Sequence, residues 1–277
     1  MRLMKAELHL GYNRRGATTV LTHSRSTHPW HFLPPHYLDD TGCATTFLVN
    51  ASGGLVGGDQ LFLKTSLHDQ THVLLTTPSA NKVYKSQTNI SRQIVECVIG
   101  SEAILEYLPL VTIPFAKSRF EQVISIKLFP RATLFFWDAL ASGRIARGER
   151  WQFTHYANHI TISMADGKKA IERYALYCDQ ENDTIGLVRN WDYVASLFLI
   201  GDGYSQKTWQ TLQSTLNTIL EKQSNKIWGS VSEPAIPGLI VKIVAQCAPD
   251  LEKLFQELWS TSRQHLLGIL PHARRQY

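Results

Sequence analysis

The most constraining feature of this sequence is a thirty-residue spacing between similar strand-like segments. Thr71–Thr77, Ser101–Tyr107 and Arg131–Trp137 each open an apolar run, and their first residues lie thirty positions apart. Ile90–Val98 and Gln122–Leu128 lie between them at near-equal offsets. Such spacing is typical of a chain that winds in successive coils, because each coil buries its apolar face only by stacking on the next. An ordinary β-sandwich with coincidental spacing is the alternative.

Short strands are predicted from residue 6 to about 200. Apolar and polar residues alternate there in runs broken by Gly, Pro, Asn and Asp, which is the period-two pattern of β-strands. The clearest examples are Ala17–Thr22, Cys43–Val49, Leu61–Leu67, Arg92–Ile99, Gln122–Leu128 and His159–Met164. We therefore predict a mainly β fold, a single domain over residues 1–277 built as a β-helix-like superhelix of stacked strands.

Two α-helices are predicted, both in the C-terminal third of the chain. Apolar residues recur at helical spacing between Ser205 and Gln223, and Ser205 suits the N-cap. A stronger apolar stripe follows Pro249 and comprises Leu251, Leu254, Phe255, Leu258 and Trp259. Between the helices, Gly238–Ala245 is predicted as a buried strand and residues 224–237 as a loop.

Composition and charge narrow the function. With 44% hydrophobic and 18% charged residues, the chain has the balance of a folded protein. The formal net charge of +5 comes without a polybasic run, which supports a nucleic-acid-binding module only weakly but favours acidic protein partners. No segment reaches the roughly 18 apolar residues of a membrane span, and no signal peptide is evident. We expect a cytoplasmic protein with neither membrane nor nucleic-acid partners.

The potential metal ligands form no recognisable motif. The cysteines lie far apart without CxxC spacing, so buried thiols are expected at Cys43, Cys97, Cys178 and Cys247. The eleven histidines are scattered, and pairs four residues apart, such as His68 and His72, arise readily by chance.

A glycine-rich stretch, Ser52–Asp59, is the most conspicuous local motif. A phosphate-binding loop of this kind joins a strand to a helix, but here a strand-like run, Gln60–Thr65, follows. The glycines are therefore predicted to allow a tight crossing between strands. That interpretation leaves Asp59 unexplained, since it sets a carboxylate on backbone that another group can approach closely.

Thr76–Ser86 carries hydroxyls, an amide and two lysines directly after a predicted strand. Ser79 and Lys82 have the SxxK spacing of acyl-transferring serine enzymes, but the sequence lacks the helix and the partner motifs of those enzymes. Because no nucleophile, base and orienting acid occur together elsewhere, we predict no catalytic residues.

Two carboxylates occur where burial is costly. Asp138 directly follows Phe135–Trp137 in an apolar strand, where a carboxylate requires a cation or a hydrogen-bond donor. Arg144 and Arg147 are its predicted partners. Glu172 is a comparable case, and strand alternation places Arg173 on the opposite side.

Four motifs, taken in order, resemble the urease accessory protein UreD (UreH) family. They are Gly53–Asp59, Leu75–Ser86, Leu105–Pro109 with Ile113–Phe115, and Gly143–Glu149. A fainter likeness continues to the C-terminus, so the resemblance covers nearly the whole chain. The motif positions that it carries over are Gly53, Gly54, Gly57, Gly58, Lys82, Glu106, Pro109, Gly143, Arg144, Gly148 and Glu149.

The resemblance implies a β-superhelix with two helices and no catalytic activity of its own. It implies a maturation factor that bridges apo-urease to the F and G accessory proteins, of which G is a GTPase that uses GTP. It also implies a path along which nickel binds transiently, and no stably bound cofactor. The carboxylates along this path would be Asp59, Asp138 and Glu172, with Thr76, Thr77 and Ser79 nearby. Oxygen donors suit such a path because they hold a divalent ion less tightly than thiolate or imidazole clusters do.

The chain departs from the family pattern at its C-terminus, Leu270–Tyr277, and at Lys242, where arginine is common. An alternative function is a β-helical hydrolase that acts on a carbohydrate or ester. In that case Asp59, Asp138 and Glu172 would supply the pair of carboxylates that glycoside hydrolysis requires.

Overall fold

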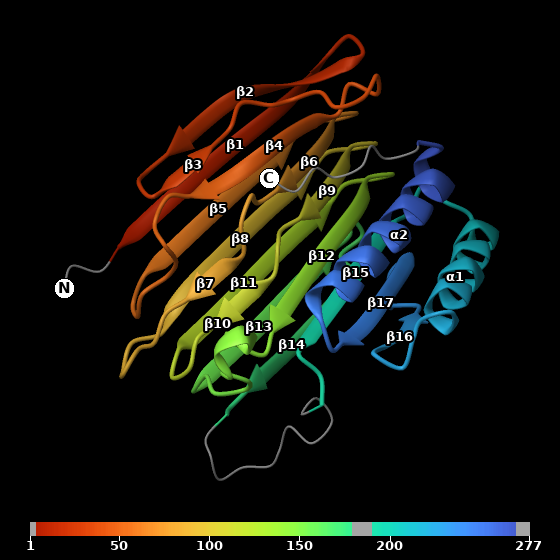
Figure 1. The fold of residues 1–277 in the computed structure, drawn as a ribbon. Helices are drawn as coiled ribbons and strands as arrows, with labels where there is room; N and C mark the ends of the chain where they lie inside the picture. Colours follow the sequence, from red (N-terminus) through yellow and green to blue (C-terminus); the bar gives the residue numbers. More distant parts are fainter. Residues whose placement is uncertain (1–3, 179–189, 270–277) are drawn as a thin grey trace.

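Two β-sheets lie face to face, and two helices cover the outer face of one of them (Figure 1). The computed structural model describes residues 4–178 and 190–269, so the divergent tail Leu270–Tyr277 lies outside the described residues. Within those ranges no helix has the length and apolar character needed to cross a membrane.

The first sheet has seven strands. In spatial order they are β14 (Lys169–Leu176), β13 (His155–Ser163), β11 (Arg119–Leu128), β8 (Ser91–Ile99), β5 (Gln60–Leu67), β1 (Lys5–Arg15) and β2 (Thr18–Ser26).

The second sheet has ten strands. Eight follow one path: β16 (Ile227–Ser232), β17 (Gly238–Ala245), β15 (Tyr193–Gly201), β12 (Thr133–Ala141), β9 (Ile104–Leu108), β6 (His72–Thr76), β4 (Ala44–Asn50) and β3 (Trp30–Phe32). Two short strands, β7 (Asn81–Val83) and β10 (Thr112–Pro114), pair beside that path.

The chain winds between the sheets in successive coils. From β4 to β13 the longer strands alternate between the two sheets, and neighbouring coils pair in parallel. His72 lies beside Ile104, and Ile104 lies beside Thr133, so the coils are offset by 32 and 29 residues. The predicted superhelix is therefore confirmed, with a repeat close to the thirty residues seen in the sequence. Antiparallel strands close the stack at both ends.

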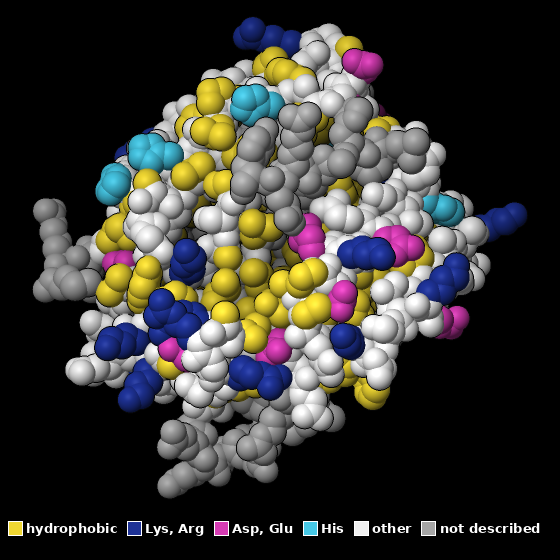
Figure 2. All heavy atoms as spheres, viewed as in Figure 1, with side chains coloured by type: hydrophobic (Ala, Val, Ile, Leu, Met, Phe, Trp, Pro, Cys, Tyr) yellow, Lys and Arg dark blue, Asp and Glu magenta, His cyan; other side chains and the backbone are white. Residues whose placement is uncertain are grey.

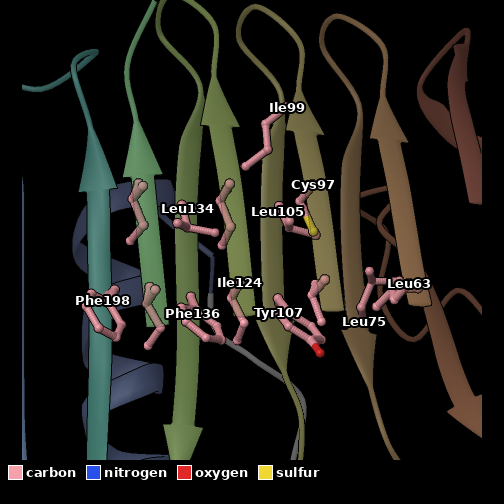
Figure 3. Close-up of a cluster of buried hydrophobic side chains, with 14 of the residues drawn as sticks. Leu63, Leu75, Cys97, Ile99, Leu105, Tyr107, Ile124, Leu134, Phe136 and Phe198 are labelled. Carbon is pink, nitrogen blue, oxygen red and sulfur yellow. The ribbon is translucent and has the colours of Figure 1, made fainter. Parts of the chain in front are cut away.

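The space between the sheets is filled by rows of side chains at equal height. Leu75, Tyr107, Phe136 and Phe198 are register neighbours on four successive strands, and Figure 3 shows them at one level. The rings of Tyr107 and Phe136 stack at 5.4 Å, as do those of Phe136 and Phe198. Each coil thus completes the apolar contacts of its neighbour.

β12 is buried on both faces, which explains its continuous apolar run Leu134–Trp137. Leu134 and Phe136 face the interior between the sheets. Phe135 and Trp137 point outward into a second core, which packs beneath α1 (Gln206–Glu221) and α2 (Ala248–Leu267).

Local sequence sets the helix boundaries largely as predicted. The Ser205 hydroxyl accepts a hydrogen bond from the Thr208 backbone N–H at 3.1 Å and caps α1. Gly268, at φ 70°, ends α2 in the left-handed conformation. The prediction of a loop at residues 224–237 is wrong, because the edge strand β16 lies there. Cys43 and Cys97 are buried as expected, whereas Cys178 and Cys247 are only half-buried.

Phe136 is the central ring of the stacked row, so its truncation tests the coil packing. We expect Phe136→Ala to lower the free energy of unfolding by about 3–5 kcal/mol, because the cavity left behind cannot close fully. Ile171→Ala, at a position that is 63% exposed, is the control and should change stability by less than about 0.5 kcal/mol. Urea denaturation of both variants measures the difference, and equal midpoints would contradict the packing described.

Candidate functional site

A row of amide side chains interrupts the apolar interior. Gln93, Gln122 and Asn158 are register neighbours on β8, β11 and β13. Each occupies an inward position of its strand: Phe120 and Ile124, on the same side as Gln122, are fully or almost fully buried. Gln122 and Asn158 are themselves buried, so these amides require partners inside the protein.

On the facing sheet, charged and hydroxyl side chains lie opposite this row. Asp138, Ser196 and Lys242 are register neighbours on β12, β15 and β17. Gln122 Nε2 donates to Asp138 Oδ1 at 2.8 Å, and Asn158 Nδ2 donates to Asp138 Oδ2 at 2.7 Å. The two sheets are therefore joined across the interior by hydrogen bonds to one carboxylate.

Burial dominates the ionisation of Asp138. Loss of hydration raises the pKa of Asp138 to about 6, the negative charge of Glu172 adds to the rise, and the hydrogen bonds from Gln122 and Asn158 oppose it. The prediction that Arg144 and Arg147 pair with Asp138 is wrong. Arg144 instead pairs with Glu149, and amide donors from neighbouring coils hold Asp138.

Glu172 lies on β14 in register with Ile160, two residues from Tyr174, which is the register partner of Asn158. Its carboxylate pairs with the Lys242 ammonium, which also donates to Ser196 Oγ at 2.8 Å. Arg173 points to the opposite face and contacts His159, as strand alternation predicts. We call the whole set the interior polar track, and its members are Gln93, Gln122, Asn158, Asp138, Ser196, Glu172 and Lys242.

A cavity of about 140 Å³ opens onto one end of this track. Its lining includes Gln122 and three predicted residues, Asp138, Thr77 and Ser79, which the structure brings together. Thr76 lies beside them on β6, but its hydroxyl donates to the Leu108 carbonyl at 2.7 Å. The space has room for several water molecules.

Asp59 lies outside the lining of this cavity and closes the glycine-rich loop. Its carboxylate accepts backbone N–H groups of Met4 at 3.2 Å and Val56 at 2.8 Å. Gly54, at φ 149°, borders the cavity, and a Cβ there would lie 2.4 Å from the Lys82 carbonyl oxygen. The loop thus needs glycine to pack against β7, as the sequence predicts.

The motif around Gly143 builds a surface groove next to the cavity. Gly143 has φ 146°, and a Cβ there would lie 2.2 Å from the Glu149 carbonyl oxygen. Arg144 pairs with Glu149 and lies 4.2 Å from the ring centre of Phe115. Lys82 lines both the groove and the cavity. Figure 2 shows Lys and Arg side chains grouped over the end of the molecule where β7 and β10 lie.

A second buried charge cluster surrounds Glu106. The carboxylate lies 2.7 Å from His72 Nε2 and accepts from Trp259 Nε1 at 2.6 Å and Arg263 Nε at 3.0 Å. Burial alone would raise the pKa of Glu106, but hydrogen bonding from His72 and the charges of His72 and Arg263 hold it below its usual range. The network fastens α2 to the coils.

Ligand atoms of Cys43, His72 and Glu106 all lie within 4.8 Å of one another. These residue types are borderline metal ligands. However, the Glu106 carboxylate is already filled by three donors, one of them the cationic Arg263, which would oppose a second cation. The donor set therefore fits a structural anchor better than a metal centre.

The UreD urease accessory protein family model matches residues 4–276. The chain belongs to the UreD family. It is 30% identical over 279 residues to a urease accessory protein UreD of Aliivibrio fischeri, a match that covers 98% of this chain and 94% of the relative. It is 30% identical over 243 residues to a UreD of Mycolicibacterium gilvum, covering 88% and 85% of the two chains. A UreD of Acaryochloris marina is 38% identical over 155 residues, covering 56% and 54%.

Sequence reasoning about this UreD chain missed most of the interior polar track. Gln122 and Asn158 stand at positions where the alternation of their strands calls for apolar residues, and Gln93 does the same on β8. That interruption is visible in the sequence. Its meaning depends on the coil register, which brings Asp138 opposite the amides.

The raised pKa of Asp138 predicts a pH-dependent stability. Because the folded-state pKa of about 6 exceeds that of the unfolded chain, this group favours the folded state at low pH and loses that effect as pH rises through 6. Between pH 5 and 7.5 the loss is on the order of 1 kcal/mol. Asp138→Asn removes it, so urea denaturation at both pH values should show a flatter profile in the variant. Parallel profiles would contradict the assignment.

Glu106 can be tested as the anchor of α2. Glu106→Gln leaves Arg263 buried with only the Asp39 carboxylate at 3.4 Å, so we expect a loss of about 3–5 kcal/mol in unfolding free energy. Glu102→Gln is the matched control, since its carboxylate pairs with Arg131 at the surface. Equal urea midpoints for the two variants would show that the network does not stabilise the fold.

Proposed function

We propose that this chain is a non-catalytic urease maturation factor of the cytosol. It bridges apo-urease to the F and G accessory proteins and provides a path for nickel to the urease active site. Membership of the UreD family supports the role in urease maturation. The observation that supports the path is the interior polar track, which leads from a cavity to a carboxylate near the surface.

The track has the chemistry that a passing nickel ion needs. Its side chains offer carboxylate, amide and hydroxyl oxygens, which bind a divalent first-row cation without the strength of thiolate or imidazole clusters. The cavity lets the ion keep part of its water shell as it moves. Asp138, buried between the sheets, is ionised above pH 6 and supplies the negative charge at the centre of the path.

The residues around the cavity fit the same role. Thr77 and Ser79 line it with hydroxyl groups, and Thr76 holds the neighbouring backbone. Asp59 keeps the glycine-rich loop closed at the border of the cavity. Nickel is cargo in this proposal, the chain keeps no stable cofactor, and GTP is used by the partner GTPase.

The size of the cavity disfavours the hydrolase alternative. Pockets that bind small organic ligands measure roughly 300–1,000 Å³, whereas this cavity measures about 140 Å³. Asp138 is enclosed by Gln122 and Asn158, and Glu172 is neutralised by Lys242. Neither carboxylate is presented to a sugar ring or an ester.

The nickel content of urease tests the path. We expect Asp138→Ala and Glu172→Ala to slow nickel loading roughly tenfold, because each removes a carboxylate from the route. Asp59→Ala should act in the same direction by loosening the loop beside the cavity. Urease purified from cells that express each variant with the F and G proteins is measured by metal analysis, and Glu102→Gln serves as the surface control.

The same cells can be used to test the nickel path separately from the bridging of urease to the F and G proteins. Co-purification of the variants with the F and G proteins and urease should stay intact, because the substituted side chains lie in the interior or close a loop. Unchanged nickel content in all three variants would overturn the path. Normal urease activation without this chain would overturn the maturation role itself.

A further inference from the structure

Lys242 is a positively charged side chain on the proposed route for metal ions, where a cation would repel the cargo. Its ammonium pairs with Glu172 and donates to Ser196 Oγ at 2.8 Å. The same nitrogen lies 5.4 Å from the ring centre of Phe198, whose face attracts cations. Two oxygen ligands and an aromatic face thus surround the ammonium, as they would surround a bound cation.

We propose that Lys242 is a tethered counter-ion that fills the nickel position at Glu172 and Ser196 and is displaced by the passing ion. The inference rests on the proposed function and adds the residue that controls it. Lys242 lies in register with Ser196, and Ser196 lies in register with Asp138, so the ammonium stands at the end of the charged row. A metal ion that has reached Asp138 meets Lys242 next.

The Lys242 side chain is exposed enough for its ammonium to move away from Glu172 into solvent. Its side chain is 44% exposed, whereas that of Glu172 is 17% exposed, so the ammonium can swing into water while the carboxylate stays in place. A divalent ion gains more than an ammonium does from the negative charges of Asp138 and Glu172, because its own charge is doubled. Exchange of one cation for another keeps the acidic end of the track neutralised at every stage.

Nickel affinity of the purified full-length chain tests this role. Ni²⁺ alone is titrated at pH 7.5 in competition with a chromophoric chelator. Lys242→Met removes the competing charge and should raise the affinity roughly tenfold. Lys242→Arg keeps a positive charge and should stay near the wild-type value. Lys253→Met, at an exposed position on α2, is the matched control and should change nothing.

A double variant shows whether the gain arises at Glu172. In Lys242→Met/Glu172→Gln the increase should vanish, because the carboxylate released by the first change is removed by the second. Lys242→Gln, which keeps a polar tip, repeats the test if the methionine variant folds poorly. An affinity within twofold of wild type in both single variants, or a gain that survives Glu172→Gln, would overturn the proposal.

The experiments distinguish failure of the nickel path from failure of the counter-ion role of Lys242. If Asp138→Ala lowers the nickel content of urease while Lys242→Met leaves the affinity unchanged, the path stands and the counter-ion role is wrong. If Lys242→Met raises the affinity while urease nickel content is insensitive to the acidic residues, the cation site exists but does not serve urease.

Discussion

Parallel stacking of coils is the constraint on which the rest of this structure depends. Each strand lies between two neighbours at a fixed register, so residues of equal height form rows that run through the whole stack. A polar side chain placed inward has only its row and the facing sheet to satisfy it. Gln122 occupies such a position, and its two register neighbours, Gln93 and Asn158, are also polar. A continuous track is therefore the stable form of a polar interior in this fold.

The sequence predicts the coil repeat, most strands and both helices, because these depend on periodicity within short windows. It fails where partners come from other coils. Asp138 was assigned to arginines a few positions downstream, but its donors are Gln122 and Asn158, 16 and 20 residues away and directly opposite in space. β16 was missed because, as a mostly exposed edge strand, it lacks a clear apolar alternation. The register between coils, which no local pattern contains, decides both cases.

The interior polar track reduces the stability of the protein compared with an apolar row. Replacing a buried polar network with packed hydrophobic residues is often neutral or stabilising, and the stacked rings one level away show that the fold accommodates such packing. The Glu106 cluster differs, since it joins α2 to the coils and thus has a structural reason to exist. The track joins the sheets one level away from an apolar row that already does so. We propose that its polarity serves the passage of a polar cargo.

In the proposed path, charge balance gives a reason for a resident cation. Burial of Asp138 and the negative charge of Glu172 raise the pKa of Asp138, whereas the positive charge of Lys242 lowers it. A protonated carboxylic acid is a poor metal ligand. Lys242 pairs with Glu172 and favours the ionised form of Asp138, and its flexible stem lets it withdraw without a rearrangement of the backbone. In this proposal the ammonium preserves a carboxylate that a passing metal ion can use.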